Sequence, residues 1–167
     1  MLNMESNKTF TALGIRWTVL EKLENGYLTI ADSIGDKEFG YNNDWKESSI
    51  RKMLNTEFAQ KLEKELGVEL PEFERDLLSL DGQKEYGSCM DKVSLISVDE
   101  YRKYRDKLPN TGDWWWTLTP HSTRKNNDSR WIAVVSPSGL INFISYLSGY
   151  GVRPVCIFPS YLFESEE

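Results

Sequence analysis

WIAVVSPSGLINFI, residues 131–144, is the stretch that decides the fold class. Trp131–Val135 carries an apolar side chain at every position, which is typical of a central strand buried on both faces. Residues 136–139, Ser-Pro-Ser-Gly, predict a tight turn, because the glycine can adopt a positive φ there. Leu140–Ile144 is then the returning strand of a hairpin, and neighbouring strands are predicted at Trp114–Leu118 and Val152–Phe158.

Upstream of these strands the sequence predicts another hairpin and one main helix. Gly14–Leu20 and Tyr27–Ser33 are short β-prone runs, and Asn25-Gly26 between them is a strong turn signal. The helix begins after Ser48, whose hydroxyl can accept hydrogen bonds from the first turn, and it ends at Gly67. Apolar side chains recur every four residues along it, which gives one buried stripe: Ile50, Leu54, Phe58 and Leu62.

The middle of the chain predicts smaller elements. We expect a short second helix over Glu72–Leu80, a loop over Asp81–Asp91 and a strand at Val93–Ser97. Ser97 lies three residues before Glu100, which is the spacing of a capping box, so a short helix is predicted over Val98–Asp106. This order of elements predicts an α+β fold in a single domain spanning residues 1–167, with a core of about 14–158.

The composition narrows the classes of function. Aromatic residues make up 13% of the 167 residues, which is enough for a large core, and Trp17, Trp45, Trp116 and Trp131 are expected in it. The apolar runs are too short for a bilayer, and the start of the chain lacks the features of a secretory signal. Two cysteines without a CxxC motif are typical of a cytoplasmic protein with reduced thiols. A net charge of −6 disfavours direct nucleic-acid binding.

The residues that carry chemistry are few. His121 is the only histidine, so His-rich metal sites are excluded, and it lies in a polar loop without a nucleophile motif nearby. Cys156 stands among apolar residues, where a thiol keeps a high pKa, and Cys89 has no evident base beside it. We therefore expect neither catalysis nor a metal or cofactor, and an enzyme is the most distant of the alternatives.

Five local patterns occur in one order along the chain. They are Trp17 in an early strand, the run from Trp45 to Phe58, Lys92–Ser97, Trp114-Trp115-Trp116 leading to Thr119-Pro120, and Gly151-Val152-Arg153-Pro154. This combination resembles a large family of bacterial and phage domains with a C-type-lectin-like fold. It is also distantly similar to the formylglycine-generating enzyme and to the variable proteins of diversity-generating retroelements. Leu118 stands where that family often has an arginine.

The resemblance implies paired terminal strands, one main helix plus minor helices, and a small C-terminal antiparallel sheet. We therefore predict that Val152–Phe158 pairs back with the N-terminal hairpin and shares a sheet with Gly14–Leu20. Arg153 should turn back to a carboxylate or to backbone carbonyls, because a buried arginine without a partner is costly.

Two loops are the leading candidate for a binding surface. His121–Arg130 is entirely polar, and Tyr146–Tyr150 lies beside the last strand. In the lectin-like relatives, loops and strands of the C-terminal sheet hold ligands, so the resemblance implies a protein-binding module, from a phage or prophage, that recognises a protein partner. The alternative is two ordinary solvated loops. The predicted contact residues are Trp115, Arg124, Lys125, Asn126, Asn127, Arg130, Tyr146 and Tyr150.

The acidic segment from Glu57 to Glu85 offers a second hypothesis. It holds nine carboxylates and four basic residues, which is typical of a solvated face but also suits a basic partner. On this hypothesis the protein is a phage inhibitor of a bacterial defence system, comparable to an anti-CRISPR protein. The residues of that alternative surface are Glu63, Glu69, Glu72 and Glu74.

Overall fold

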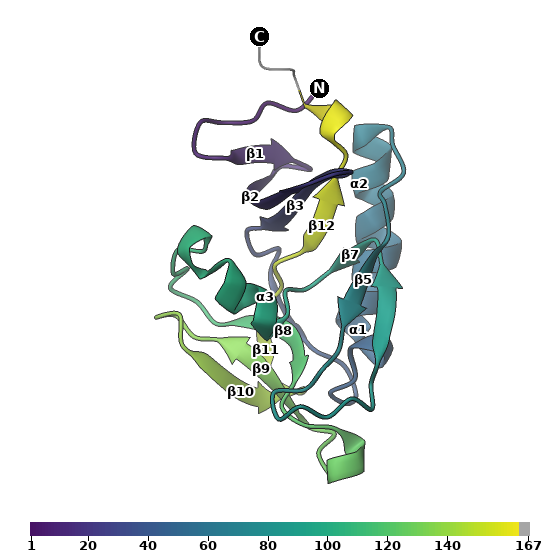
Figure 1. The fold of residues 1–167 in the computed structure, drawn as a ribbon, viewed down its shortest axis with the longest axis vertical. Coiled ribbons are helices and arrows are strands. Elements are labelled where there is room, and N and C mark those ends of the chain that lie inside the picture. The colour runs from purple at the N-terminus through teal and green to yellow at the C-terminus, as the bar shows by residue number, and fades with distance from the viewer. Residues whose placement is uncertain (164–167) are drawn as a thin grey trace.

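A sheet that joins the two ends of the chain forms one half of the molecule (Figure 1). The computed structural model describes residues 1–163, and this sheet has the strand order β1-β2-β3-β12-β7. Its strands are β1 (Thr9–Ala12), β2 (Ile15–Leu23), β3 (Gly26–Ala31), β12 (Val155–Phe158) and β7 (Val93–Ser94). Because β12 pairs antiparallel with β3, the predicted return of the last strand to the N-terminal hairpin is confirmed.

A second five-stranded sheet forms the other half, with the order β10-β9-β8-β11-β4. Its strands are β4 (Asp36–Glu38), β8 (Trp115–Pro120), β9 (Trp131–Val135), β10 (Ile141–Ser145) and β11 (Gly149–Gly151). The hairpin predicted from residues 131–144 is confirmed, since β9 and β10 pair antiparallel from Val135 and Ile141 onward. The sheet therefore presents two edge strands, β10 and β4.

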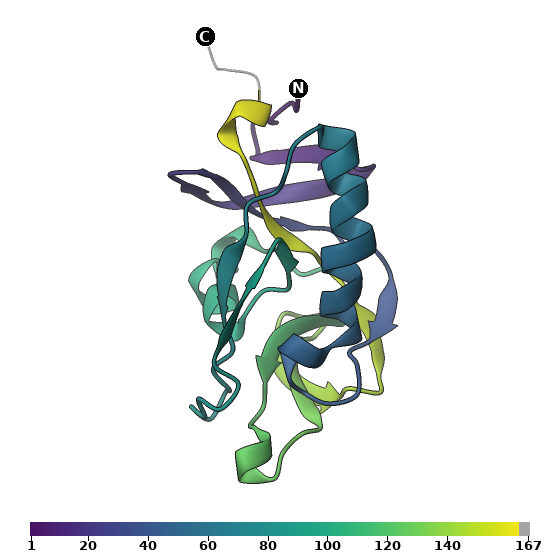
Figure 2. The same ribbon diagram turned by 90° about the vertical axis from the view of Figure 1, so that its right-hand side faces the viewer.

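One long helix runs along both sheets (Figure 2). It consists of α1 (Ser49–Met53), a wider π-helical turn (Leu54–Phe58) and α2 (Ala59–Leu66), and it matches the prediction. Ser48 Oγ accepts the N–H of Arg51 at 3.0 Å, and Gly67 ends the helix with a φ of +68°. The π-helical turn was not predicted. Its Asn55 side chain accepts the N–H of Val93 at 3.0 Å and donates to the same residue's carbonyl at 2.8 Å, which fastens the helix to β7.

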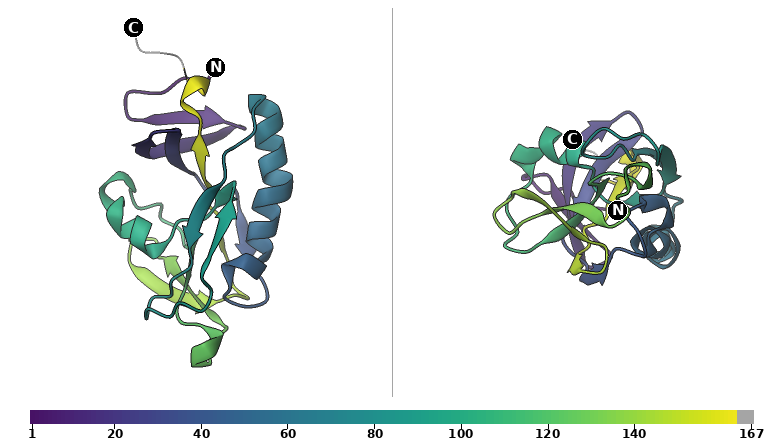
Figure 3. Two further views of the ribbon diagram at one scale, coloured as in Figure 1. Left: turned by 45° about the vertical axis from the view of Figure 1, so that its right-hand side comes forward. Right: turned by 90° about the horizontal axis from the view of Figure 1, so that it is seen from below.

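The segment after the helix differs from its prediction. The helix predicted over Glu72–Leu80 and the loop predicted over Asp81–Asp91 are both wrong in part, because β5 (Phe73–Asp76) pairs antiparallel with β6 (Ser88–Asp91). The physical reason is an alternation of burial, with Arg75 inward between two exposed carboxylates. The small β5-β6 sheet lies beside the long helix (Figure 3).

The predicted short helix is present as α3 (Val98–Lys103), which ends three residues earlier than expected. Its capping box is complete, because Ser97 Oγ accepts the N–H of Glu100 and the Glu100 carboxylate accepts the N–H of Ser97. A 3-10 turn over Arg105–Lys107 follows it. Together these elements make an α+β fold with one main helix and three sheets in residues 1–163.

The core consists of two clusters of apolar side chains. The larger one lies between the two five-stranded sheets and the long helix, and its largest members are Phe10, Trp17, Trp45, Trp116 and Phe158. The smaller one lies under α3, and its aromatic members are Tyr101, Tyr104 and Trp115. Within residues 1–163, no helix is long and apolar enough to cross a bilayer.

Candidate partner-binding site

Arg124 fixes the centre of the polar loop between β8 and β9, residues 121–130, to neighbouring elements. The Arg124 guanidinium contacts three carboxylates and one aromatic ring: Asp44 at 3.2 Å, Glu47 at 3.1 Å, Glu85 at 3.9 Å and Tyr86 at 5.0 Å to the ring centre. Hydrogen bonds from Asn42 and Arg124 hold the pKa of Glu47 below its ordinary value. Arg124 therefore cross-links the loop to the rest of the fold, which restrains its side chain before any partner arrives.

The three residues after Arg124 complete a turn at the end of the molecule. The backbone N–H of Lys125 donates to a carboxylate of the preceding loop at 2.6 Å, and the Asn126 side chain donates to Ser122 Oγ at 3.2 Å. Asn127 has a φ of +56°, in the left-handed region that asparagine tolerates. The side chains of Lys125, Asn126 and Asn127 are exposed. These three predicted contact residues are therefore accessible.

Asp128 fixes the other end of the loop. One carboxylate oxygen accepts the N–H groups of Arg130 at 3.1 Å and of Trp131 at 3.2 Å, and the other lies 3.1 Å from His121 Nδ1. These bonds place the His121 ring beside the β9-β10 hairpin. No role was predicted for Asp128, although an aspartate side chain commonly accepts the backbone N–H two residues further on, as it does here for Arg130.

Four residues form an exposed group that we name the β9-β10 patch: His121, Arg130, Trp131 and Phe143. The rings of His121 and Phe143 lie 4.3 Å apart, and those of Trp131 and Phe143 lie 5.9 Å apart. The Arg130 guanidinium lies 5.4 Å above the Trp131 ring. Phe143 is 50% exposed, and Trp131, expected in the core, is only half-buried. The patch therefore combines aromatic area with one cation at the surface.

The sheet separates the predicted contact residues onto two faces. Phe143 of β10 pairs with Ala133 of β9, whereas Trp116 of β8 pairs with Val134. Consecutive residues of a strand point to opposite faces, so the patch and Trp116 lie on different faces. The Tyr150 ring lies 5.5 Å from the Trp116 ring and belongs to that second face. Arg130 and Tyr150, predicted as one surface, are thus not brought together.

The predicted anchor Trp115 does not lie on a surface. It is 3% exposed and packs in the smaller core cluster, so its assignment to a partner-binding surface is wrong. The exposed member of the three tryptophans is Trp114, which stacks on Tyr150 at 5.6 Å. Tyr146 is half-buried against the larger core cluster, and its backbone N–H donates to the carbonyl of Arg130. Of the two predicted tyrosines, neither is fully exposed.

The ring of Trp115 instead packs against the buried guanidinium of Arg153. The Arg153 guanidinium lies 4.7 Å above the Trp115 ring, and its Nε donates to the carbonyl of Ala31 at 2.9 Å. The prediction that Arg153 turns back to a backbone carbonyl is confirmed. Arg153 is 5% exposed, however, and its Nη1 has no hydrogen-bond partner in the described part of the chain. Burial lowers the pKa of Arg153 to about 10.

Replacing Arg153 with methionine is expected to raise the free energy of unfolding by about 1–3 kcal/mol, because an apolar side chain of similar length removes a buried charge. Above pH 10 the unfolded state binds more protons at this site than the folded state, so the wild type gains stability there. The advantage of Arg153→Met should therefore shrink as the pH rises above about 10. Urea unfolding checks both effects, with Arg102→Met as the control, because the side chain of Arg102 is 67% exposed. A loss of stability would mean that the Ala31 bond and the Trp115 contact outweigh the charge.

Two of the four residues of the acidic alternative, Glu63 and Glu69, contact one lysine, Lys92. Glu63 accepts Lys92 Nζ at 2.9 Å, and Glu69 lies 3.5 Å from the same atom. Glu69, Glu72 and Glu74 are exposed, whereas Glu63 also accepts the N–H of Leu70 and is partly buried. The carboxylate of Glu63 is thus used inside the fold, and Lys92 offsets part of the charge of this surface.

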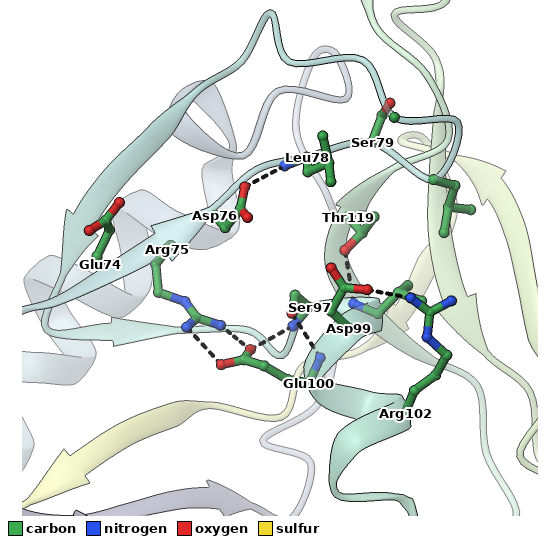
Figure 4. A pocket seen from close by; sticks show the side chains of 13 residues that line it. Glu74, Arg75, Asp76, Leu78, Ser79, Ser97, Asp99, Glu100, Arg102 and Thr119 are labelled. Carbon is green, nitrogen blue, oxygen red and sulfur yellow. Dashed lines mark hydrogen bonds and ion pairs between the residues drawn. The ribbon is translucent and has the colours of Figure 1, made fainter.

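A polar cavity of about 340 Å³ lies between the β5 segment and α3 (Figure 4). Arg75 and Glu100 form a two-bond ion pair on its wall, and Asp99 pairs with Arg102. Arg75 also donates to Ser94 Oγ and to the carbonyl of Leu95. These charged side chains pair with one another rather than pointing into the cavity. The Arg75–Glu100 pair therefore links β5 to α3.

The two thiols have raised pKa values. Burial raises the pKa of Cys89 to about 11, with a further contribution from the charge of Asp91, and complete burial raises that of Cys156. Both cysteines are therefore protonated at neutral pH, and the thiol is a much weaker nucleophile than the thiolate. In residues 1–163, no group of three His, Cys, Asp or Glu side chains is placed to hold a metal ion.

Comparison with known proteins gives one match. The family described as Domain of unknown function (DUF6273) matches residues 24–160, which run from just before β3 to just after β12. No curated protein and no solved structure matches the chain. The matched span includes the long helix, the whole second sheet and the β9-β10 patch. Because the match covers most of the sequence, the chain belongs to the DUF6273 family.

Proposed function

We propose that this chain is a non-catalytic protein-binding module with a C-type-lectin-like fold, and that the β9-β10 patch is its contact surface. The observation that carries the proposal is the exposed cluster of His121, Trp131 and Phe143 with Arg130 stacked on it. Aromatic and arginine side chains dominate the energetic centres of protein interfaces. A partly exposed aromatic cluster that a cation covers on one side has the composition of such a centre.

The arrangement of the sheets supports the lectin-like part of the proposal. The first and last strands share one sheet, and the main helix packs on it. Four strands of the second sheet come from the C-terminal third, whereas its edge strand β4 comes from residues 36–38 and β11 pairs parallel with β8, so this sheet is not purely C-terminal or antiparallel as expected. The protonated thiols and the structural use of Arg124 support a role in binding rather than catalysis. We place the module in the cytoplasm of a bacterium or of a cell infected by its phage, where both cysteines stay reduced.

The acidic surface is the second candidate. Glu69, Glu72 and Glu74 are exposed, which suits an inhibitor of a basic nuclease. Lys92 contacts Glu69, however, and Glu63 is bound within the fold. We favour the β9-β10 patch, because its aromatic area is exposed without an internal use, whereas the acidic residues are sufficiently explained as a solvated face.

Phe143→Asp is expected to weaken partner binding at least tenfold, because it places a carboxylate at the centre of the patch. The measurement is quantitative capture of proteins from the native host, followed by titration of the retained partner. Tyr41→Asp is the control, since Tyr41 is 84% exposed and lies outside the patch. The combined reversal of Glu69, Glu72 and Glu74 to lysine should leave binding unchanged.

Salt dependence separates the two candidates a second time. Binding through the patch should change little between about 0.05 and 0.5 M salt, whereas binding through exposed carboxylates should weaken steeply. Full binding by Phe143→Asp, together with its loss in the triple reversal, would overturn the proposal and favour the inhibitor.

A further inference from the structure

The two edges of the second sheet differ in charge. β4, at one edge, consists of Asp36, Lys37 and Glu38, all exposed, and charged side chains of this kind prevent unwanted strand pairing. β10, at the other edge, reads Ile-Asn-Phe-Ile-Ser over Ile141–Ser145, without any charge. The whole span 131–163 contains no aspartate or glutamate, in a chain that has 26 of them. The β10 edge therefore lacks the charged residues that protect the β4 edge.

The hydrogen bonds of the hairpin show which peptide groups of β10 face outward. Ser136 N donates to the carbonyl of Leu140 at 2.8 Å, and Tyr146 N donates to the carbonyl of Arg130 at 3.1 Å. Hydrogen-bonded pairs alternate along an antiparallel ladder, so Asn142 and Ile144 turn their peptide groups toward β9. Ile141, Phe143 and Ser145 turn theirs away from the sheet.

The outward peptide groups of Ile141 and Phe143 are open to a further strand. In residues 1–163, the sheet order gives β10 a single neighbour, β9, and Figure 1 shows it on the outer side of the lower sheet. The peptide groups of Ile141 and Phe143 make no other backbone hydrogen bond in the described chain, whereas the carbonyl of Ser145 also accepts the N–H of Ser148. Asn142 and Phe143 are exposed beside them.

We propose that β10 pairs antiparallel with β10 of a second copy of this chain, about a twofold axis at Phe143. This deepens the proposed function, on which it rests, by naming the partner at the β9-β10 patch. The axis lies between the two Phe143 residues, whose peptide groups face outward. Phe143 therefore pairs with Phe143 of the second copy, and Ile141 pairs with Ser145 of the second copy. The peptide groups of Phe143 then meet those of the other copy, and those of Ile141 meet Ser145, whose carbonyl also accepts the N–H of Ser148 in its own copy. Two five-stranded sheets become one.

The side chains fit the same axis. Leu140 and Leu147 flank Phe143, three residues before it and four after it, and they are 64% and 54% exposed. The twofold brings the two Phe143 rings together on one face of the joined sheet, where a cross-strand aromatic pair is favourable. Each copy carries a net charge of −6, so two copies repel one another. The repulsion is weakest where the edges that meet carry no charged side chains.

The contact between the two copies is small. One strand pair and three exposed apolar side chains from each copy make an interface at the small end of the range, below about 800 Å² for each partner. We therefore expect a dimer that dissociates at micromolar concentration, with a Kd of roughly 10–100 µM. The dimer should persist from about 0.05 to 0.5 M salt, because the paired edges carry no charge.

Sedimentation equilibrium of the full chain from about 5 to 500 µM tests the proposal. The wild type should shift from monomer to dimer, and Phe143→Asp should remain a monomer, with the association weakened at least tenfold. Tyr41→Asp, the same change at an exposed site outside the edge, should dimerise like the wild type. A wild type that stays monomeric at 500 µM, or a Phe143→Asp dimer of unchanged strength, overturns the proposal.

A cross-linking experiment tests the register. Phe143→Cys in a Cys89→Ser background should be joined to a second copy by a short bismaleimide, because paired residues of adjacent strands lie about 5 Å apart. Tyr41→Cys in the same background should not be joined, and equal cross-linking of both variants contradicts the twofold at Phe143. A monomeric wild type that captures another protein through Phe143 overturns this inference alone, whereas a monomer that captures none overturns the proposed function as well.

Discussion

Glu100→Ala is expected to lower the free energy of unfolding by about 3–5 kcal/mol, because it leaves a buried charge without its partner. Arg75 is 4% exposed, and Glu100 holds its guanidinium through two bonds, one of them 2.9 Å long. Without Glu100 the buried cation keeps two hydrogen bonds, to Ser94 Oγ and the carbonyl of Leu95, and its contact with the Phe73 ring, but no carboxylate. The same change removes the acceptor for the N–H of Ser97, so α3 also loses half of its capping box.

Two neighbouring variants separate these contributions in urea unfolding. Glu100→Gln keeps an acceptor for Ser97 and for one Arg75 donor, so it should lose less than Glu100→Ala. Asp99→Ala removes a carboxylate whose side chain is 67% exposed, and it should change stability by less than about 0.5 kcal/mol. Equal losses in Glu100→Ala and Asp99→Ala would show that the buried pair has no special weight.

The same ion pair predicts how stability depends on acid. Burial alone would raise the pKa of Glu100, but the hydrogen bonds and the charge of Arg75 outweigh it, and the pKa lies below its ordinary value. A carboxyl whose folded-state pKa is lowered contributes its stability fully above the unfolded-state pKa, and it loses that contribution as the pH falls through the folded value. The difference between the wild type and Glu100→Gln should therefore shrink below about pH 4.

The elements that depend on local sequence were predicted correctly. Trp131–Val135 is a strand at the predicted bounds, because its continuous apolar run fits a strand buried on both faces. The long helix has its predicted cap at Ser48 and its predicted end at Gly67, since both depend on the neighbouring backbone. The capping box at Ser97 follows the same logic. In each case the residues that determine the structure lie within one turn of it.

The elements that depend on distant partners were not predicted. β5 carries a buried arginine, which suits a strand only because Glu100 lies across from it, 25 residues away. The candidate site was mispredicted for a related reason. Trp115 and Phe143 point to the same face of the second sheet. α3 covers this face at Trp115 but leaves Phe143 uncovered. The spacing of residues along a strand predicts which side chains share a face of the sheet, but it does not predict which face another element covers.

Gly26→Ala is expected to lower the free energy of unfolding by about 3 kcal/mol, which is the upper end of the cost of overpacking. The predicted hairpin is present, but Glu24 and Asn25 make its turn, and Gly26 already belongs to β3. A methyl group on Gly26 would overlap the carbonyl oxygen of Phe158 and lie 2.9 Å from its carbonyl carbon. Because these atoms belong to the backbone of β12, the two strands must separate to admit it.

The separation would reach the centre of the core. Phe158 is fully buried, and its ring lies 4.8 Å from the rings of both Phe10 and Trp17. Gly14→Ala is the matched control for Gly26→Ala, because Gly14 also has a positive φ but no atom within 4 Å of the added methyl group. It should cost about 1 kcal/mol through backbone strain alone. Urea unfolding of both variants measures the difference in stability. Equal losses would show that β12 moves away from the added methyl group without cost, and that β3 and β12 are not tightly packed at Gly26.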